Sequence, residues 1–131
     1  MDLTNRFDPS TALAAILSCD PENIITRTPP DLPPYLLLEA LAQTCGMHLR
    51  FRRHFLVDVF LASASDLVYE EHPAPVTIRA RLTGETGAAA GYEAAVESSP
   101  PCRMIMGYRP ALADTFFRRR FQCLSSHSSI L

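Results

Sequence analysis

One stretch constrains the fold more than any other: Tyr35–Leu49 (YLLLEALAQTCGMHL) is apolar at nearly every position. Its length and composition predict a helix, and a helix that is apolar around most of its circumference is covered on most sides. The rest of the chain must therefore supply a sheet or further helices that surround it. Glu39 places a carboxylate inside this segment, where burial is costly unless the charge has a partner.

The flanking residues indicate where this helix begins and ends. Four prolines in Pro29–Pro34 (PPDLPP) exclude regular structure before it, because proline has no N–H to donate. Asp31 is the predicted N-cap, with Pro33 and Pro34 in the first turn, where backbone donors are unpaired anyway. Arg50–Phe55 (RFRRHF) brings cations to the C-terminal end, where the helix dipole favours them.

The remaining segments are patterned for strands. Thr11–Cys19 is compatible with strand or helix, and with the β-branched Ile24–Thr28 beyond the turn DPEN it predicts a hairpin. Four strands predicted after the helix, joined as an antiparallel meander, are Val57–Tyr69, Val76–Gly84, Tyr92–Ser98 and Cys102–Arg109. This order predicts an α+β fold in which an antiparallel sheet wraps around one long helix.

Length and composition indicate one domain. A chain of 131 residues builds one core rather than two, and we place the domain at residues 1–110 and a tail, partly helical and then frayed, at 111–131. No run of about 18 apolar residues occurs, so no membrane span is predicted. The N-terminus lacks a basic segment followed by an apolar stretch, so a cytoplasmic location is expected.

The positions of cysteine, histidine and arginine along the chain restrict the kinds of site that the protein can contain. The four cysteines and four histidines lie far apart, so we expect free thiols, no metal site and no cofactor. A net charge of −2 gives little support to nucleic-acid binding. Two arginine clusters, one of Arg50, Arg52 and Arg53 and one of Arg118–Arg120, could dock an acidic carrier protein or coenzyme A phosphates, or could be solvated surface.

The segment Pro34–Gly46 (PYLLLEALAQTCG) resembles the central helix of the hotdog-fold β-hydroxyacyl-acyl-carrier-protein dehydratases, which carries the letters EALAQ. The resemblance covers about Thr11–Tyr108 and includes the strand and the proline-containing loop that follow the helix. It implies a hotdog fold and a homodimer whose sheets join edge to edge. It also implies an apolar tunnel between the subunits for the acyl thioester of an acyl-carrier protein or coenzyme A.

In that family a carboxylate on the helix works with a histidine from a loop of the other subunit. The resemblance assigns the carboxylate to Glu39 and the family's glutamine to Gln43, one turn further on, where it can hold the Glu39 side chain. It assigns substrate binding to Tyr35, whose N–H can polarise the thioester carbonyl, and to Pro34, which replaces a glycine and has no N–H. His72, in the loop EEHPAP, could reach the site or be solvated.

The family's catalytic histidine has no counterpart, because the matching position is Ile25 and no histidine precedes Met47. Loss of an acid–base partner costs about 10² to 10⁴ in rate, and loss of an oxyanion donor about 10² to 10³. The predicted function is therefore a β-hydroxyacyl-thioester dehydratase-like protein of fatty-acid or polyketide type metabolism, impaired in that reaction.

Three alternatives to this prediction stay open. One is an acyl thioesterase in which Glu39 activates water. Another is a non-catalytic subunit that binds acyl thioesters, alone or in a heterodimer with a hotdog subunit that supplies the histidine. In the third, Glu39 is a buried acid satisfied by Gln43 and kept only for structure.

Overall fold

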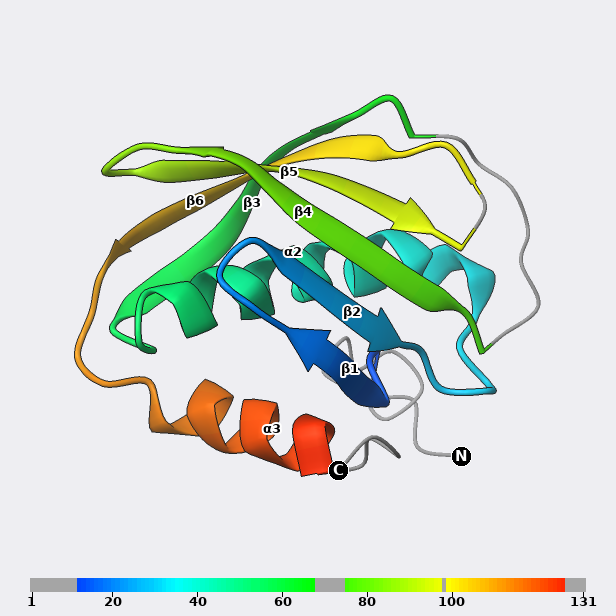
Figure 1. The fold of residues 1–131 in the computed structure, drawn as a ribbon, viewed down its shortest axis with the longest axis horizontal. Helices are drawn as coiled ribbons and strands as arrows, with labels where there is room; N and C mark the ends of the chain where they lie inside the picture. Colours follow the sequence, from blue (N-terminus) through cyan, green and yellow to red (C-terminus); the bar gives the residue numbers. More distant parts are fainter. Residues whose placement is uncertain (1–11, 68–74, 98, 127–131) are drawn as a thin grey trace.

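The computed structural model describes residues 12–67, 75–97 and 99–126 (Figure 1). In this part of the chain, a six-stranded antiparallel sheet covers one long helix, α2, which confirms the predicted α+β class. The elements in chain order are β1 (Ala15–Cys19), β2 (Asn23–Arg27), the 3-10 helix η2 (Pro34–Leu36), α2 (Leu37–Arg52), β3 (Val57–Ser65), β4 (Thr77–Glu85), β5 (Ala89–Val96), β6 (Cys102–Pro110) and α3 (Thr115–Ser126).

Helix α2 is buried against the sheet along most of its length, as its composition predicts. Cys45 and Leu49 are fully buried and belong to the same core cluster as Tyr92 of β5. Its one buried hydroxyl is satisfied, because the Thr44 Oγ1 donates to the Ala40 carbonyl at 2.8 Å and lies 2.8 Å from the Thr26 Oγ1 of β2. The hydrogen bonds to Thr44 therefore tie the middle of α2 to β2.

The predicted N-cap at Asp31 is wrong. The residue before α2 is Leu36, and no side chain of the described residues caps the helix. The chain enters through the turn of η2, in which the Leu36 N–H donates to the Pro33 carbonyl at 2.9 Å. Pro34 begins the helical winding with Pro33 as the extended residue before it, two residues later than an N-cap at Asp31 requires.

The strand order is β1-β2-β4-β5-β6-β3. Strands β1 and β2 form the predicted hairpin, and β4, β5 and β6 form a meander. The prediction that β3 continues into this meander is wrong, because β3 pairs with β6 instead of β4. The sheet closes around α2, so the strand after the helix lies at one edge of the sheet and the first strand at the other.

Two local features correct the predicted strand bounds. Strand β5 begins at Ala89 and not at Tyr92, because the turn is short: the Thr86 Oγ1 accepts from the Ala88 and Ala89 N–H groups at 3.2 and 3.1 Å. A bulge between Leu82 and Gly84 shifts the register of β4 on β5. Strand β3 ends at Ser65, and the rest of its predicted range falls partly outside the described residues.

Helix α3 is the helix predicted in the tail, and it lies alongside β1 and the C-terminal end of α2 (Figure 1). Leu124 is buried in the core cluster, and Phe117 and Phe121 pack against that cluster. The Phe121 ring stacks on Phe51 of α2, with centroids 5.5 Å apart. The domain boundary at residues 110/111 stays a prediction, and residues 127–131 lie outside the described part.

Candidate functional site

A groove of about 360 Å³ runs along α2 on the side of β3, β6 and α3. Helix α2 contributes the residues that share one face through a spacing of three and four: Glu39, Ala42, Gln43, Gly46 and Arg50. Strands β3 and β6 contribute Val59, Phe60, Leu61 and Met106, and α3 contributes Phe116, Phe117 and Arg120. The groove is therefore mostly apolar, with the Glu39 carboxylate and the Arg50 guanidinium at opposite ends of its α2 face and the Arg120 guanidinium contributed by α3.

Glu39 lies half-buried in the first turn of α2, where the helix dipole favours a negative charge. The Gln43 Nε2 donates to the Glu39 Oε1 at 3.3 Å, so the contact expected between these two side chains is present. This hydrogen bond holds the Glu39 carboxylate beside Gln43 in the groove. The catalytic roles of both residues stay predictions.

Arg50, at the other end of the groove, folds back along α2. Its guanidinium carbon lies 3.7 Å from the centroid of the Phe117 ring, and its Nη2 donates to the Val59 carbonyl at a long 3.5 Å. Its Nε lies 3.7 Å from the Asp114 Oδ2, and this buried Nε has no hydrogen-bond partner among the described residues. Burial lowers the pKa of Arg50, and the carboxylates of Asp114 and Asp58 oppose that shift.

Gly46 leaves space on α2 beside the folded-back Arg50. A Cβ at this position would lie 3.1 Å from the Arg50 Nη1 and 3.6 Å from the nearest side-chain atoms of Met106 and Val59. A glycine inside a helix costs about 1 kcal/mol relative to alanine, so this one gives up helix stability for space in the groove. Sequence reasoning missed Gly46 and the contribution of Phe116 and Phe117, for which the amphipathic tail was the available signal.

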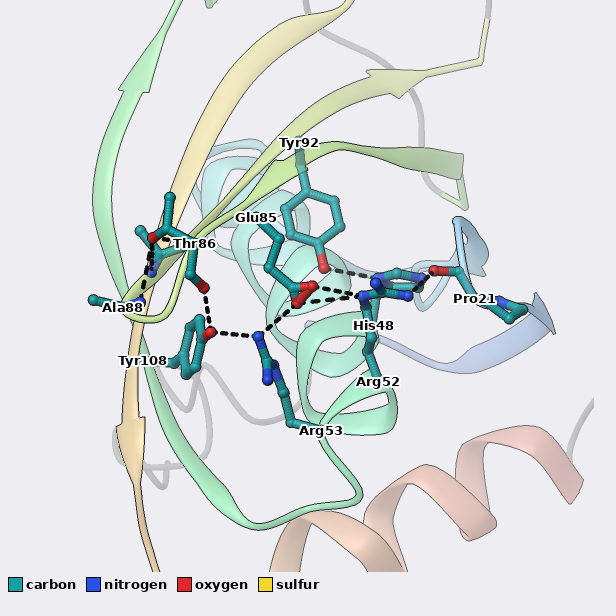
Figure 2. Close-up of polar contacts among 10 residues, drawn as sticks. Pro21, His48, Arg52, Arg53, Glu85, Thr86, Ala88, Tyr92 and Tyr108 are labelled. Carbon is teal, nitrogen blue, oxygen red and sulfur yellow. Dashed lines mark hydrogen bonds and ion pairs between the residues drawn. The ribbon is translucent and has the colours of Figure 1, made fainter.

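Arg52 and Arg53, predicted with Arg50 to dock a carrier, lie at a different place (Figure 2). The Arg52 Nε donates to the Glu85 Oε1 at 2.9 Å, and the Arg53 Nη2 lies 3.0 Å from the Glu85 Oε2. Arg53 also donates to the Tyr108 hydroxyl at 2.5 Å, and that hydroxyl donates to the Thr86 carbonyl. Both guanidinium groups therefore bind Glu85 at the end of β4, and their docking role stays a prediction.

His48 is buried on the opposite side of α2 from the groove, as its position nine residues after Glu39 predicts. Its Nε2 lies 2.9 Å from the Asp20 carbonyl and its Nδ1 lies 2.7 Å from the Tyr92 hydroxyl (Figure 2). Because a carbonyl only accepts, the Nε2 carries the proton and the Nδ1 accepts from Tyr92. Burial lowers the pKa of His48, which keeps the ring neutral.

Two other predicted site residues, Tyr35 and Pro34, do not line the groove. Tyr35 and Pro34 are exposed in η2, one turn before Glu39. His72 lies outside the described residues. His54 lies in a separate cavity with Phe51 and Phe55, so neither of the two histidines in the described ranges lines the groove.

The thiols offer no nucleophile at this site. All four cysteines are free, and none of them lines the groove. Burial, with a smaller contribution from Asp20, raises the pKa of Cys19 to about 12, and burial also raises the pKa of Cys45 and Cys102. These groups are therefore protonated at neutral pH.

The described residues contain no group of three or more histidine, cysteine, aspartate or glutamate side chains that could hold a metal ion. Within the same ranges, no helix has the length and apolarity needed to cross a membrane. The cytoplasmic location stays a prediction.

A curved antiparallel sheet around one central helix, with a groove along that helix, defines the hotdog fold. A solved structure described as "The Dehydratase Heterocomplex ApeI:P from Xenorhabdus doucetiae" is similar to this chain with a TM-score of 0.58. The match covers 88% of this chain and 91% of the other at 12% sequence identity, which shows a common fold. No protein-family model matches the sequence, and no curated protein does.

Proposed function

We propose that this protein is a β-hydroxyacyl-thioester dehydratase-like hotdog subunit that acts together with a second, histidine-bearing hotdog subunit. The observation that carries the proposal is the pairing of Glu39 and Gln43 inside a mostly apolar groove of about 360 Å³. A groove of this size and polarity suits an acyl chain with one reacting polar group. The metabolism is of the fatty-acid or polyketide type.

The proposed reaction needs one acid and one base. The partner histidine removes a proton from C2 of the substrate, Glu39 gives its proton to the 3-hydroxyl, and water leaves as the C2–C3 double bond forms. Gln43 holds the Glu39 carboxyl in place for that transfer. The missing histidine makes the lone chain a poor dehydratase, because one acid–base group contributes about 10² to 10⁴ in rate.

The edge of the sheet supports a partner subunit. Strand β3 is paired only with β6 among the described strands, so one of its sides presents unpaired backbone groups. Phe60 and Leu61 of β3 and Ile105 of β6 are exposed large apolar side chains beside that edge. The similar solved structure is described as a dehydratase heterocomplex, and a heterodimer is the arrangement proposed here.

Hydrolysis of the thioester is a second candidate function. Glu39 is half-buried in a groove that is open to solvent, so water can reach its carboxylate. A carboxylate that activates such a water would need no histidine. Dehydration and hydrolysis release different products, so one assay separates them.

The test is a paired assay of the full chain, alone and mixed with a histidine-bearing hotdog subunit that co-purifies with it. A 3-hydroxyacyl thioester and a saturated acyl thioester are offered, while enoyl product and free thiol are measured separately. We expect enoyl product only in the mixture, with a loss of about 10² or more for Glu39→Gln. Glu22→Gln, which changes an exposed carboxylate at the β1–β2 turn, is the matched control.

Three other outcomes of this assay would contradict the proposal or a part of it. Free thiol that disappears in Glu39→Gln would make the protein a thioesterase and overturn the dehydratase proposal. Enoyl product from the chain alone would overturn the need for a partner. Equal rates for the wild-type chain and Glu39→Gln in both channels would remove Glu39 from catalysis.

A further inference from the structure

Helix α3 presents exposed apolar side chains next to the edge strand β3. Phe116 of α3 is 62% exposed and lines the same groove as Phe60 and Leu61 of β3. Leu112, in the segment that leads into α3, is 92% exposed. The Ala111 N–H donates to the Leu56 carbonyl at 2.9 Å, so this segment lies beside the residue that precedes β3.

These residues form one surface that starts on β3 and reaches α3. We call it the rim surface, because it borders the groove beside α2; its members are Leu56, Phe60, Leu61, Leu112 and Phe116. Exposed apolar side chains that gather in one place mark an interaction site more often than single ones do. The rim surface is therefore a candidate contact for another protein.

The fold of this chain does not require Phe116 to be apolar. Helix α3 packs on the core through Phe117, Phe121 and Leu124, which follow the helical spacing of three and four. The Phe116 ring lies edge-to-face against Phe117, with centroids 5.0 Å apart. An exposed aromatic ring that is already held in place is a good interface anchor, because it loses little freedom on binding.

The edge of β3 alone offers little apolar area to a partner. Phe60, Leu61 and Ile105 are each about half exposed or less, so together they present on the order of 250 Å² of side-chain surface. A standard interface buries about 800 Å² on each partner. Leu56, Leu112 and Phe116 more than double the apolar area that a partner at β3 can bury.

The charge of α3 indicates what such a partner carries around its apolar contact. The helix contains three arginines and no acidic residue. Arg119 is exposed and follows Phe116 by three positions, so it borders the rim surface. Interfaces have an apolar centre and a polar rim with complementary charge, which here requires carboxylates on the partner.

Resting on the function proposed above, we propose that the histidine-bearing hotdog subunit contacts α3 as well as β3, with Leu112 and Phe116 as its anchors on the α3 side. A second copy of this chain does not meet the need, because it brings Ile25 again to the position of the family's histidine. A partner that binds the whole rim surface lies across the groove and limits the access of water to Glu39.

The test measures binding between the full chain and its co-purifying histidine-bearing hotdog subunit by titration calorimetry, without any thioester, so that acyl binding does not contribute. We expect Phe116→Ala and Leu112→Ala each to weaken binding about tenfold or more, as interface anchors do. Gln122→Ala, at an exposed position of α3 outside the rim surface, is the matched control and should bind within about twofold of wild type. Arg119→Glu should weaken binding about threefold or more by charge repulsion.

A structural effect is separated from an interface effect by two observations. Urea unfolding of each variant alone should coincide with that of the wild-type chain, since both substituted side chains are mostly exposed. Leu112 lies outside the helix, so Leu112→Ala tests the surface even where Phe116→Ala disturbs α3.

The contradicting results distinguish the rim surface from the proposed function. Weaker binding for Phe60→Ala with none for Phe116→Ala and Leu112→Ala would confine the partner to β3, overturning the α3 contact and leaving the function standing. An unchanged affinity for Arg119→Glu would overturn the acidic rim. Lack of binding between the two wild-type subunits would overturn both the contact and the function.

Sedimentation velocity of the chain alone tests the choice of occupant. We expect no dimer that depends on the rim surface. A dimer of the chain alone that dissociates in Phe116→Ala would assign the surface to a second copy and overturn the proposed partner.

Discussion

The two ends of helix α2 are built in opposite ways. At the C-terminal end, Arg52 and Arg53 share the carboxylate of Glu85, and Arg53 also donates a hydrogen bond to the Tyr108 hydroxyl (Figure 2). One helical turn earlier, the buried His48 donates to the Asp20 carbonyl in the β1–β2 turn. At the N-terminal end, no side chain in the described ranges caps the first turn, and the half-buried Glu39 accepts a long hydrogen bond of 3.3 Å from Gln43.

The two ends of α2 therefore have different roles: the C-terminal end fixes the helix to the sheet, and the N-terminal end carries the proposed acid, Glu39. Ion pairs and hydrogen bonds at the C-terminal end fix the position of α2 in the sheet. Because of that, the N-terminal end can leave its first backbone N–H groups without side-chain acceptors, which is the arrangement in which helices receive anions and polarised carbonyls. Substitutions at the two ends should therefore affect different properties.

The largest expected effect on stability is at the C-terminal end. Glu85→Ala leaves Arg52 and Arg53 without their shared carboxylate, and we expect a loss of about 2 kcal/mol in the free energy of unfolding. The value is below that for a fully buried pair because both arginine side chains are about one-third exposed, at 35% and 38%. Urea unfolding followed by circular dichroism measures it.

The control for Glu85→Ala lies on the same pair of strands. Glu93 pairs with Arg81 at 3.0 Å, but these side chains are 40% and 56% exposed, so Glu93→Ala should cost about 0.5 kcal/mol or less. Equal losses for the two variants would mean that the Glu85 network contributes no more than a surface ion pair. The contrast between the two ends of α2 would then fail.

A smaller effect should depend on pH through His48. Burial lowers the pKa of folded His48 below its ordinary value of about 6.5, so the unfolded chain binds the proton first as the pH falls. The stability from neutral His48 is thus fully present above about pH 6.5 and declines as the pH falls toward the lowered folded pKa. Thermal unfolding between pH 8 and pH 5 measures the decline.

His48→Gln keeps a polar side chain at this position and removes the titrating ring, so its stability should change less over the same pH range. Tyr92→Phe, which takes away the hydroxyl bonded to the His48 Nδ1, should cost about 1 kcal/mol at pH 8. A pH dependence of the same size in wild type and His48→Gln would show that other groups cause it.

The smallest effect on stability is expected at Glu39. Glu39→Gln keeps the shape of the side chain and changes only a half-buried group with one long hydrogen bond, so we expect a change within about 0.5 kcal/mol. The same variant is expected to lose activity in the paired assay. A loss above about 2 kcal/mol would indicate a structural acid and contradict the division between the two ends.

The sequence predicted the elements whose signals are local. An apolar run with one acid predicted α2, β-branched residues around DPEN predicted the β1–β2 hairpin, and the i, i+4 spacing predicted the contact between Glu39 and Gln43. These patterns depend on residues close in the chain, so periodicity and turn chemistry are sufficient to find them. The Asp31 cap failed because two prolines can start a helical turn without any side-chain acceptor.

The features that the sequence did not predict depend on distant contacts. Nothing in residues 57–65 indicates that β3 pairs with β6. The two arginine clusters were predicted together, but only the fold separates Arg50 and Arg120 from Arg52, Arg53 and Arg118. Likewise, Gly46 is a plain small residue in the sequence, and only the fold shows that a Cβ there would lie 3.1 Å from the Arg50 Nη1.

The pairing of β3 with β6 also sets an order of events during synthesis. Residues 66–101 lie between the two strands, so a ribosome completes β3 on the order of seconds before β6 emerges. During that interval β3 lacks β6, its one neighbour in the described sheet. A nascent chain that stalls before residue 102 would thus leave β3 without a paired strand, and unpaired strand edges promote aggregation. Synthesis of β6 is therefore the step that covers one edge of β3.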